Sequence, residues 1–324
     1  MVMVNHPHPQ MKRDTVFSLD GEWYLNGGTI QVPYPPQSKL SGYKGHIGDV
    51  LVYEKRFMIP ESFDKKRVLL HFGAVDQVAE VYLNGKHVGR HEGGYLEFTI
   101  DITRDMFMKK ENFLQVIAED TCSTIYPYGK QSKNPQGMWY TAVSGIWKSV
   151  WLEAVPRDYI RFLKMTPDLS GVTIQIYGAT SKLRSSFCVK YEEYGEVKEQ
   201  KFTRHASDIG LVGRLTLESP HLWTCEDPYL YHIVITYGED EVATYFALRT
   251  ISVCVDHQVA RVFLNQQPIF LHGVLDQGYF PNGIYVPEDT RDYERDILYM
   301  KRLGFNCIRK HIKVEPERFY YDCD

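Results

Sequence analysis

The sequence predicts a mainly β protein in which two sandwich domains precede a short segment of alternating strands and helices. Two observations support this prediction. Apolar and polar residues alternate along short runs over most of the chain, which is typical of strands with one buried face. Helical spacing occurs only near residue 293, between two apolar runs, and a crossover between parallel strands has this order.

The first 155 residues contain alternating runs separated by polar turns, a pattern that indicates a sandwich or jelly roll. The runs are 51–59, 68–72, 78–89, 96–102, 112–120 and 145–155. Within 78–89, Asn84-Gly85 predicts a two-residue hairpin turn of type I′, because both residues accept positive φ angles.

Residues 156–252 contain a second set of candidate strands. These are 172–178, 186–193, 214–219, 230–238 and 241–253. The size of this block fits an immunoglobulin-like sandwich.

Residues 253–324 change character. The run PIFLHGV (268–274) is short and apolar, which predicts a strand buried on both faces of a parallel sheet. The run FNCIRKHI (305–312) is expected to be its parallel neighbour. Together they predict one βα unit and the start of a second.

The helix between these two runs has recognisable ends. Tyr293, Ile297 and Met300 share one apolar face. Thr290 or Asp289 can cap its first turn, and Gly304 can supply the left-handed residue after its last turn. Pro316 suits the first turn of a second helix.

Composition excludes several classes of function. The chain has 37 basic and 41 acidic residues, so nothing favours nucleic acid or an anionic membrane. It has no membrane-length apolar run and no signal-peptide core, so we expect a cytoplasmic protein. Its six cysteines are scattered, and no histidines have zinc spacing; we expect neither a metal site nor a cofactor. The 23 tyrosines are compatible with sugar contacts or simply reflect strand preference.

One loop in the first domain, 121–144, is long for a hairpin and rich in aromatic residues. Long loops in compact domains are often functional. The alternative is an aromatic plug against the neighbouring domain, which we favour for Trp139 and Tyr140. Asp120, just before this loop, shares the apolar face of its strand and needs a partner or a ligand. It can also cap the next turn, and spacing alone favours the cap.

Five motifs then appear in a fixed order along the chain. They are Gly21-Glu22-Trp23 after Leu19-Asp20, Tyr53–Phe57, Val81–Gly85, Ser144–Trp147, and Leu264-Asn265 through Gly273-Val274. In this order they resemble glycoside hydrolase family 2, which includes β-galactosidases, β-glucuronidases and β-mannosidases. The similarity runs from about Leu19 to Asp324.

The resemblance implies three domains: a jelly-roll sugar-binding domain (1–155), an immunoglobulin-like sandwich (156–252) and a truncated start of a (β/α)8 TIM barrel (253–324). It implies a carbohydrate substrate and a possible homo-oligomer. It maps His311 onto a sugar-contacting histidine at the end of the second barrel strand, and Asp120 onto an aspartate that reaches into the same pocket. Without the family resemblance, His311 is equally well interpreted as a histidine at a strand end whose hydrogen bonds are made within the protein.

Asp276 and Gln277 follow the first predicted barrel strand, and barrel enzymes keep their sites at this end of the strands. The chain reads Leu275-Asp276-Gln277-Gly278 where better-known members have Arg-His-Glu. An aspartate there would accept hydrogen bonds from sugar hydroxyls.

No catalytic residue is assigned. In this family the acid/base glutamate follows the fourth barrel strand and the nucleophile lies near the seventh, so both are expected beyond Asp324. Retaining glycosidases need two carboxyl groups roughly 5–5.5 Å apart. We interpret Glu315 and Glu317 as charges favoured by a helix dipole.

The expected function is therefore the N-terminal part of a retaining β-glycosidase, inactive by itself. The alternative is a stand-alone carbohydrate-binding module that uses Tyr126, Tyr128 and Trp139. An unfinished barrel, which leaves apolar surface open, counts against that alternative.

Overall fold

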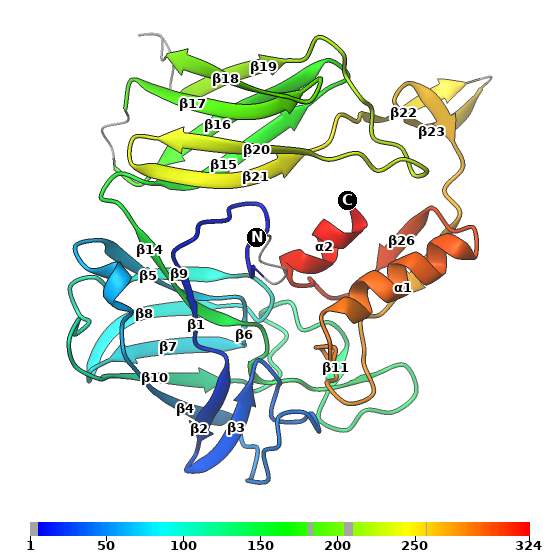
Figure 1. Cartoon of the computed structure of the whole chain (residues 1–324). Coiled ribbons are helices and arrows are strands. Elements are labelled where there is room, and N and C mark those ends of the chain that lie inside the picture. Colours follow the sequence, from blue (N-terminus) through cyan, green and yellow to red (C-terminus); the bar gives the residue numbers. More distant parts are fainter. Residues whose placement is uncertain (1–5, 181–183, 204–209, 257) are drawn as a thin grey trace.

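The computed structural model describes residues 6–180, 184–203, 210–256 and 258–324. Within these ranges the protein is mainly β, as predicted, with two short α-helices close to the C-terminus. Figure 1 shows one two-sheet body below, a second above it, and the helices beside both. Neither helix is long and apolar enough to cross a membrane.

The first sandwich consists of two antiparallel sheets that enclose one apolar core. One sheet has the order β1 (Val16–Ser18), β14 (Val150–Val155), β5 (Arg67–Phe72), β9 (Phe98–Asp101). The other has the order β3 (Gly28–Val32), β2 (Gly21–Leu25), β4 (Val50–Phe57), β10 (Asn112–Glu119), β7 (Val78–Leu83), β8 (Lys86–Glu92). The core is built by alternate residues, such as Leu51 and Tyr53 of β4, as the spacing predicts.

Local sequence accounts for the connections in this sandwich. Asn84 and Gly85 have φ angles of 53° and 81°, so the predicted hairpin turn between β7 and β8 is confirmed. A single 3₁₀ turn, η1, spans Glu61–Phe63. Two further ladders are short: β6 (Val75–Asp76) with β13 (Gly145–Ile146), and β11 (Gln131–Ser132) with β12 (Tyr140–Thr141).

The second sandwich also has two sheets around its own core, which includes Ile174, Val189 and Ile235. The three-stranded sheet has the order β15 (Ile160–Pro167), β16 (Gly171–Gly178), β19 (Leu211–Thr216). The four-stranded sheet has the order β18 (Glu196–Thr203), β17 (Ser186–Glu193), β20 (Tyr231–Tyr237), β21 (Asp240–Phe246).

Three features of this sandwich differ from the prediction, and the first is strand β15, which none of the predicted runs covers. Strand β18 was not predicted, because EVKEQKFT has only two apolar residues, Val197 and Phe202, and lies at a sheet edge, where none of its residues is fully buried. The predicted run 241–253 is two strands in different sheets, since β22 (Ile251–Asp256) leaves the sandwich. It pairs with β23 (Val259–Leu264), and β23 pairs with β24 (Gln267–Ile269).

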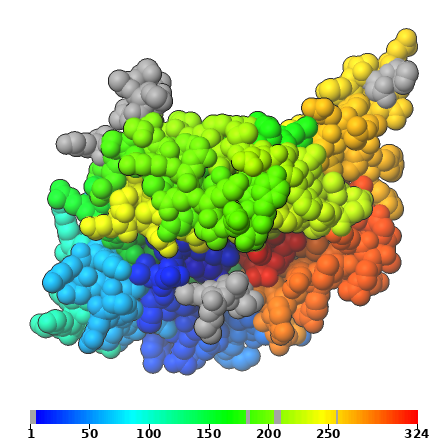
Figure 2. Space-filling model, turned by 45° about the horizontal axis from the view of Figure 1, so that its top comes forward, coloured from blue at the N-terminus to red at the C-terminus, as the bar shows by residue number. Residues whose placement is uncertain are grey.

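This small sheet carries a hairpin, β22–β23, that projects from the body (Figure 2). Val253 and Val255 of β22 are 70% and 76% exposed. The hairpin therefore contributes little to either sandwich core.

The C-terminal segment (273–324) contains the predicted crossover. Parallel strands β25 (Gly273–Asp276) and β26 (Cys307–Lys310) are joined through helix α1 (Arg291–Arg302), and helix α2 spans Glu317–Cys323. Gly304 has a φ of +89°, as predicted. Of the two predicted caps, Asp289 accepts the backbone N–H of Arg291 at 2.9 Å.

The prediction for 268–274 was wrong in one respect. The run is not one strand buried on both faces, because β24 ends at Ile269 and β25 begins at Gly273. Phe270 between them is 83% exposed and Leu271 is 49% exposed. Among the described residues, β26 is the one strand that pairs with β25.

Candidate functional site

Three of the four predicted site residues lie together where β25 and β26 end. Asp276 is the last residue of β25, Gln277 follows it and is exposed, and the backbone N–H of His311 donates to the Asp276 carbonyl at 2.8 Å. The half-buried ring of His311 has no hydrogen-bond partner among the described residues. That ring is therefore available to a ligand.

Asp276 is less available. One of its carboxylate oxygens, Oδ1, accepts the Gly278 N–H at 2.8 Å, while Oδ2 accepts the ammonium of Lys310 at 2.6 Å. These bonds close the turn after β25 and link the ends of the two parallel strands.

Asp120 comes from the first sandwich, directly after β10, and is 9% exposed. Its Oδ1 accepts the N–H of Cys122 at 2.7 Å, which is the turn cap that spacing favoured. Burial raises the pKa of this carboxyl, although the bond to Cys122 and the charge of Lys133 act in the opposite direction.

The loop after Asp120 reaches the segment after His311. Gly129 has a φ of +60°, and a side chain there would collide with the Tyr95 hydroxyl and the Ile312 carbonyl oxygen. A glycine is therefore required for this close approach. This contact places the loop that follows Asp120 beside the segment that follows His311, although the two are distant in sequence.

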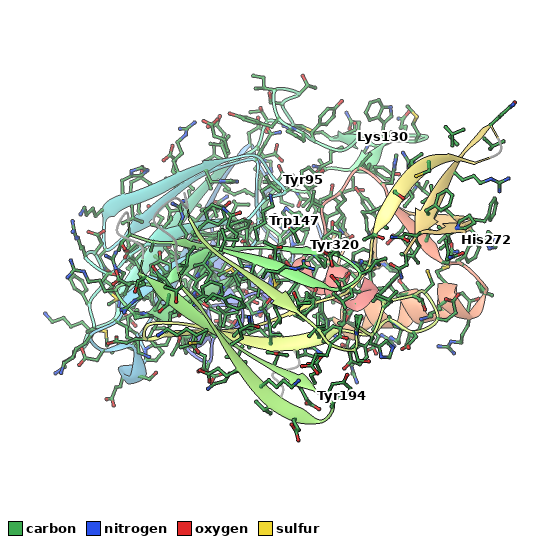
Figure 3. All side chains as sticks on the ribbon, turned by 90° about the horizontal axis from the view of Figure 1, so that it is seen from above. Tyr95, Lys130, Trp147, Tyr194, His272 and Tyr320 are labelled. Carbon is green, nitrogen blue, oxygen red and sulfur yellow. The ribbon has the colours of Figure 1, made fainter. Side chains whose placement is uncertain are left out.

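Three buried aromatic side chains, Tyr95, Trp147 and Tyr285, pack together next to this contact. Tyr285 packs edge-on against Trp147 at 4.9 Å between ring centroids, and its hydroxyl lies 3.3 Å from that of Tyr95. Tyr95 and Trp147 appear together near the middle of Figure 3, between the first sandwich and the C-terminal segment. All three rings are at least nine-tenths buried.

Two aromatic residues of the loop 121–144, Tyr140 and Trp139, differ in their contacts and exposure. Tyr140 stacks on Tyr279 at 4.7 Å, so it packs between domains as predicted. Trp139 is 42% exposed, so the plug interpretation was wrong for it. The tight turn around Gly137 (φ +59°) precedes it, and its ring remains open to solvent.

Asp76 is a buried acid that the sequence analysis missed. It is 1% exposed in β6, and its Oδ2 accepts the side-chain amide of Gln131 at 3.0 Å. Burial, reinforced by the charge of Asp120, raises the pKa of Asp76 to about 7. An aspartate inside an apolar strand (Ala74-Val75-Asp76) was the signal that could have identified it.

Glu315 was also misinterpreted. It does not lie in a helix, because α2 begins at Glu317, and its side chain is fully buried. Its Oε1 accepts the ammonium groups of Lys310 at 2.7 Å and Lys313 at 3.0 Å. Ion pairing, which spacing cannot reveal, explains this charge better than a helix dipole.

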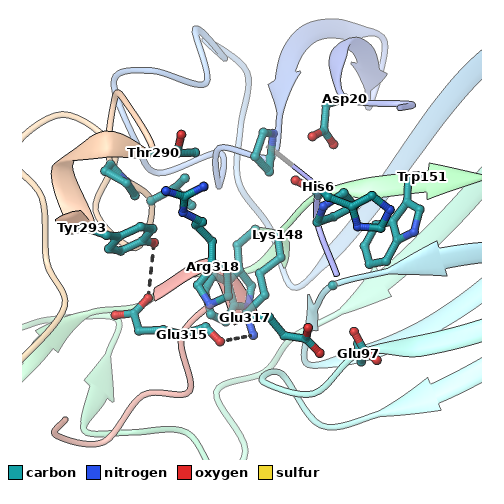
Figure 4. A pocket seen from close by; sticks show the side chains of 18 of the residues that line it. His6, Asp20, Glu97, Lys148, Trp151, Thr290, Tyr293, Glu315, Glu317 and Arg318 are labelled. Atoms are coloured by element: carbon teal, nitrogen blue, oxygen red, sulfur yellow. Dashed lines mark hydrogen bonds between the residues drawn. The ribbon is translucent and has the colours of Figure 1, made fainter. Parts of the chain in front are cut away.

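A cavity of about 690 Å³ lies beside this region, between the first sandwich, residues 286–290 and α2. Lys148, Glu315 and Glu317 are on its wall, as Figure 4 shows. None of the four predicted site residues lines it. The cavity and the strand-end site are therefore separate features of the same domain joint.

Two family models match this chain. Residues 25–149 match the model described as glycosyl hydrolase 2 galactose-binding domain-like. Residues 159–249 match the model described as glycosyl hydrolases family 2.

Curated relatives are similar over most of this chain. A β-galactosidase of Thermoanaerobacter pseudethanolicus is 26% identical over 291 residues, which is 84% of this chain and 37% of the relative. A β-glucuronidase of Bacteroides fragilis is 26% identical over 320 residues, covering 88% of this chain and 44% of the relative. The chain thus spans less than half the length of either relative.

Solved structures share the fold. An apo β-glucuronidase from Ruminococcus gnavus superposes with a TM-score of 0.78 at 21% identity, over 97% of this chain and 58% of that one. A β-glucuronidase from Bacteroides uniformis gives 0.72 at 21% identity, over 97% of this chain and 41% of that one.

Proposed function

Because the chain belongs to glycoside hydrolase family 2, we propose that it is part of a retaining β-glycosidase and forms one wall of its sugar site. The finer fold assignment is part of the same proposal. The first sandwich is a jelly roll, the second is immunoglobulin-like, and β25–α1–β26–α2 opens a (β/α)8 barrel.

The observation that carries this proposal is the meeting of two regions distant in sequence. The loop after Asp120 touches Ile312, the residue after His311. In a barrel that begins with β25 and β26, the His311 ring, with no hydrogen-bond partner among the described residues, would be at the end of the strands where barrel enzymes bind substrate. An imidazole can donate to or accept from a sugar hydroxyl.

The acids at this joint do not supply the catalytic pair. A retaining glycosidase needs two carboxyl groups roughly 5–5.5 Å apart, both able to reach the glycosidic bond. Asp76 is 1% exposed, Glu315 is enclosed by lysines, and both oxygens of Asp276 are engaged. We therefore propose that these 324 residues bind sugar and do not hydrolyse it.

The test uses the chain joined to a barrel-completing sequence and aryl β-glucuronide, β-galactoside and β-mannoside substrates. His311→Ala is expected to lower kcat/KM on the preferred substrate by about 10²–10³, the loss of hydrogen bonds that strengthen in the transition state. His46→Ala, an exposed histidine, is the matched control and should leave kcat/KM unchanged. Unchanged kinetics in His311→Ala would remove the site assignment.

A second candidate function rests on the exposed loop. Trp139 and Met138 are 42% and 63% exposed, which suits stacking on a sugar ring in a binding module. If the chain is such a module, Trp139→Ala abolishes retention on polysaccharide gels while His311→Ala does not. The glycosidase proposal expects monosaccharide binding to depend on His311.

A further inference from the structure

We propose that His8, Glu97 and Glu317 bind one divalent transition-metal ion, with Zn²⁺ as the best match. Their ligand atoms lie within 4.8 Å of one another. His8 Nε2 is 3.1 Å from Glu317 Oε1. His8 belongs to the N-terminal segment, Glu97 directly precedes β9, and Glu317 is the first residue of α2.

Unsatisfied polar atoms at the same place support a ligand. The Oε2 of Glu317 is buried and has no hydrogen-bond partner among the described residues. His6 is only 5% exposed, and its buried Nε2 also lacks a partner there. Buried polar atoms are rarely left unpaired, so each needs an explanation. His6, Glu97 and Glu317 all line the 690 Å³ cavity (Figure 4).

The charges at the cavity wall also favour a cation. Glu97 has no ion pair among the described residues, and Glu317 pairs only with His8. Lys148, the buried cation nearby, donates instead to the carbonyls of Tyr95 at 2.9 Å and Glu315 at 3.3 Å. Among the described residues these two carboxylates have one close ion-pair partner, the His8 imidazole, while Lys148 acts on them only from a longer distance, so a bound dication balances them.

The donor set decides the kind of metal. One imidazole nitrogen and two carboxylate oxygens suit Zn²⁺, whose bonds to such ligands are about 2.0–2.2 Å long. Mg²⁺ and Ca²⁺ prefer ligand sets made wholly of oxygen. With three protein ligands, a fourth position remains, and water or a small molecule from the cavity can occupy it.

The consequence is a link between three parts of the chain. A metal here ties the N-terminal segment and α2 to the first sandwich. Because an ion that binds only the folded state stabilises it, the melting temperature must rise with metal concentration.

The experiment measures Zn²⁺ binding to the chain itself, by calorimetry and by thermal unfolding. We expect one ion per chain and a rise in melting temperature of about 3–5 °C at roughly 100 times Kd. Mg²⁺ should give no comparable shift. Glu97→Gln, at an exposed position, should weaken Zn²⁺ binding by about 10–100-fold.

Two further variants complete the test. His8→Ala should abolish binding, while the surface control His46→Ala should bind as well as the parent. Binding that Glu97→Gln and His8→Ala leave unchanged, or a shift given equally by Mg²⁺, would overturn the proposal. Since the readout is metal binding, it is independent of any glycosidase activity.

Discussion

Two buried charged clusters hold the first sandwich to its neighbours, and they differ in charge balance. The arginine cluster (Arg13, His71, Glu153, Asp240) joins it to the second sandwich. The lysine cluster (Lys148, Lys310, Lys313, Asp276, Glu315) joins it to the C-terminal segment.

In the arginine cluster every charge has a close partner. Arg13 is bidentate to Asp240, with both N–O distances at 2.8 Å, and bonds Glu153 at 3.0 Å. Burial alone would raise the pKa of Glu153, but His71 and Arg13 outweigh it and lower that pKa to about 2. The Glu153 carboxylate therefore stays ionised at neutral pH.

In the lysine cluster three ammonium groups share two carboxylates. Burial lowers the pKa values of Lys148 and Lys313 to about 8, although Glu315 acts in the opposite direction. The comparison teaches that ion pairing outweighs burial at Glu153 in one joint, while burial outweighs ion pairing at Lys148 and Lys313 in the other, so their charged forms cost stability at neutral pH.

The largest effect should come from removing the centre of the balanced cluster. Arg13→Met leaves Asp240 buried without its ion-pair partner and Glu153 with only His71, at 3.5 Å, and breaking a buried pair typically costs about 3–5 kcal/mol of unfolding free energy. Urea unfolding measures it. Arg56→Met, which breaks an exposed pair with Glu111, is the control and should cost less than about 1 kcal/mol. Equal losses of unfolding free energy in Arg13→Met and Arg56→Met would mean that the buried arginine cluster contributes no more to stability than an exposed ion pair.

A smaller loss is expected at the centre of the lysine cluster. Lys313→Met leaves the carbonyls of Gly278 and Tyr285 unbonded, at about 1–3 kcal/mol each. Part of this cost is offset, because the variant also removes surplus charge while Lys310 still pairs with Glu315. The net loss of unfolding free energy should therefore be about 2 kcal/mol. A loss as large as that of Arg13→Met would contradict the comparison.

The smallest effect for a single group is a dependence of stability on pH. The folded-state pKa of Lys148 and Lys313 lies below the unfolded value, so the unfolded chain binds more protons between pH 8 and 10. Stability should rise with pH in that window, by about 1–2 kcal/mol per lysine between pH 8 and 9.5. Urea unfolding at a series of pH values measures the slope.

The arginine cluster should respond only to acid. The depressed pKa of Glu153 means that its contribution is present above the unfolded value and is lost as pH falls toward 2. Lys148→Met should roughly halve the rise of the unfolding free energy with pH above pH 8. It should leave the fall of the unfolding free energy in acid unchanged. If the unfolding free energy of the parent did not change above pH 8, the folded state would not lower the pKa values of Lys148 and Lys313.

The sequence was informative wherever a structure is decided by neighbours in the chain. The turn at Asn84-Gly85, the helix that ends before Gly304 and the alternating core of β4 were all predicted, because φ preferences and side-chain alternation are local. It was less informative for β18, whose polar residues carry no burial signal, and for 268–274, whose apolar residues lie exposed.

By itself the sequence determined the mainly β character, the crossover near the C-terminus and the family. Only the tertiary structure decided which charges meet. Asp76 beside Asp120, Glu315 between two lysines, and His8 beside Glu97 and Glu317 each join positions that no spacing connects. The physical reason is that pairing and burial of a charge depend on what the fold packs against it, and that packing comes from distant parts of the chain.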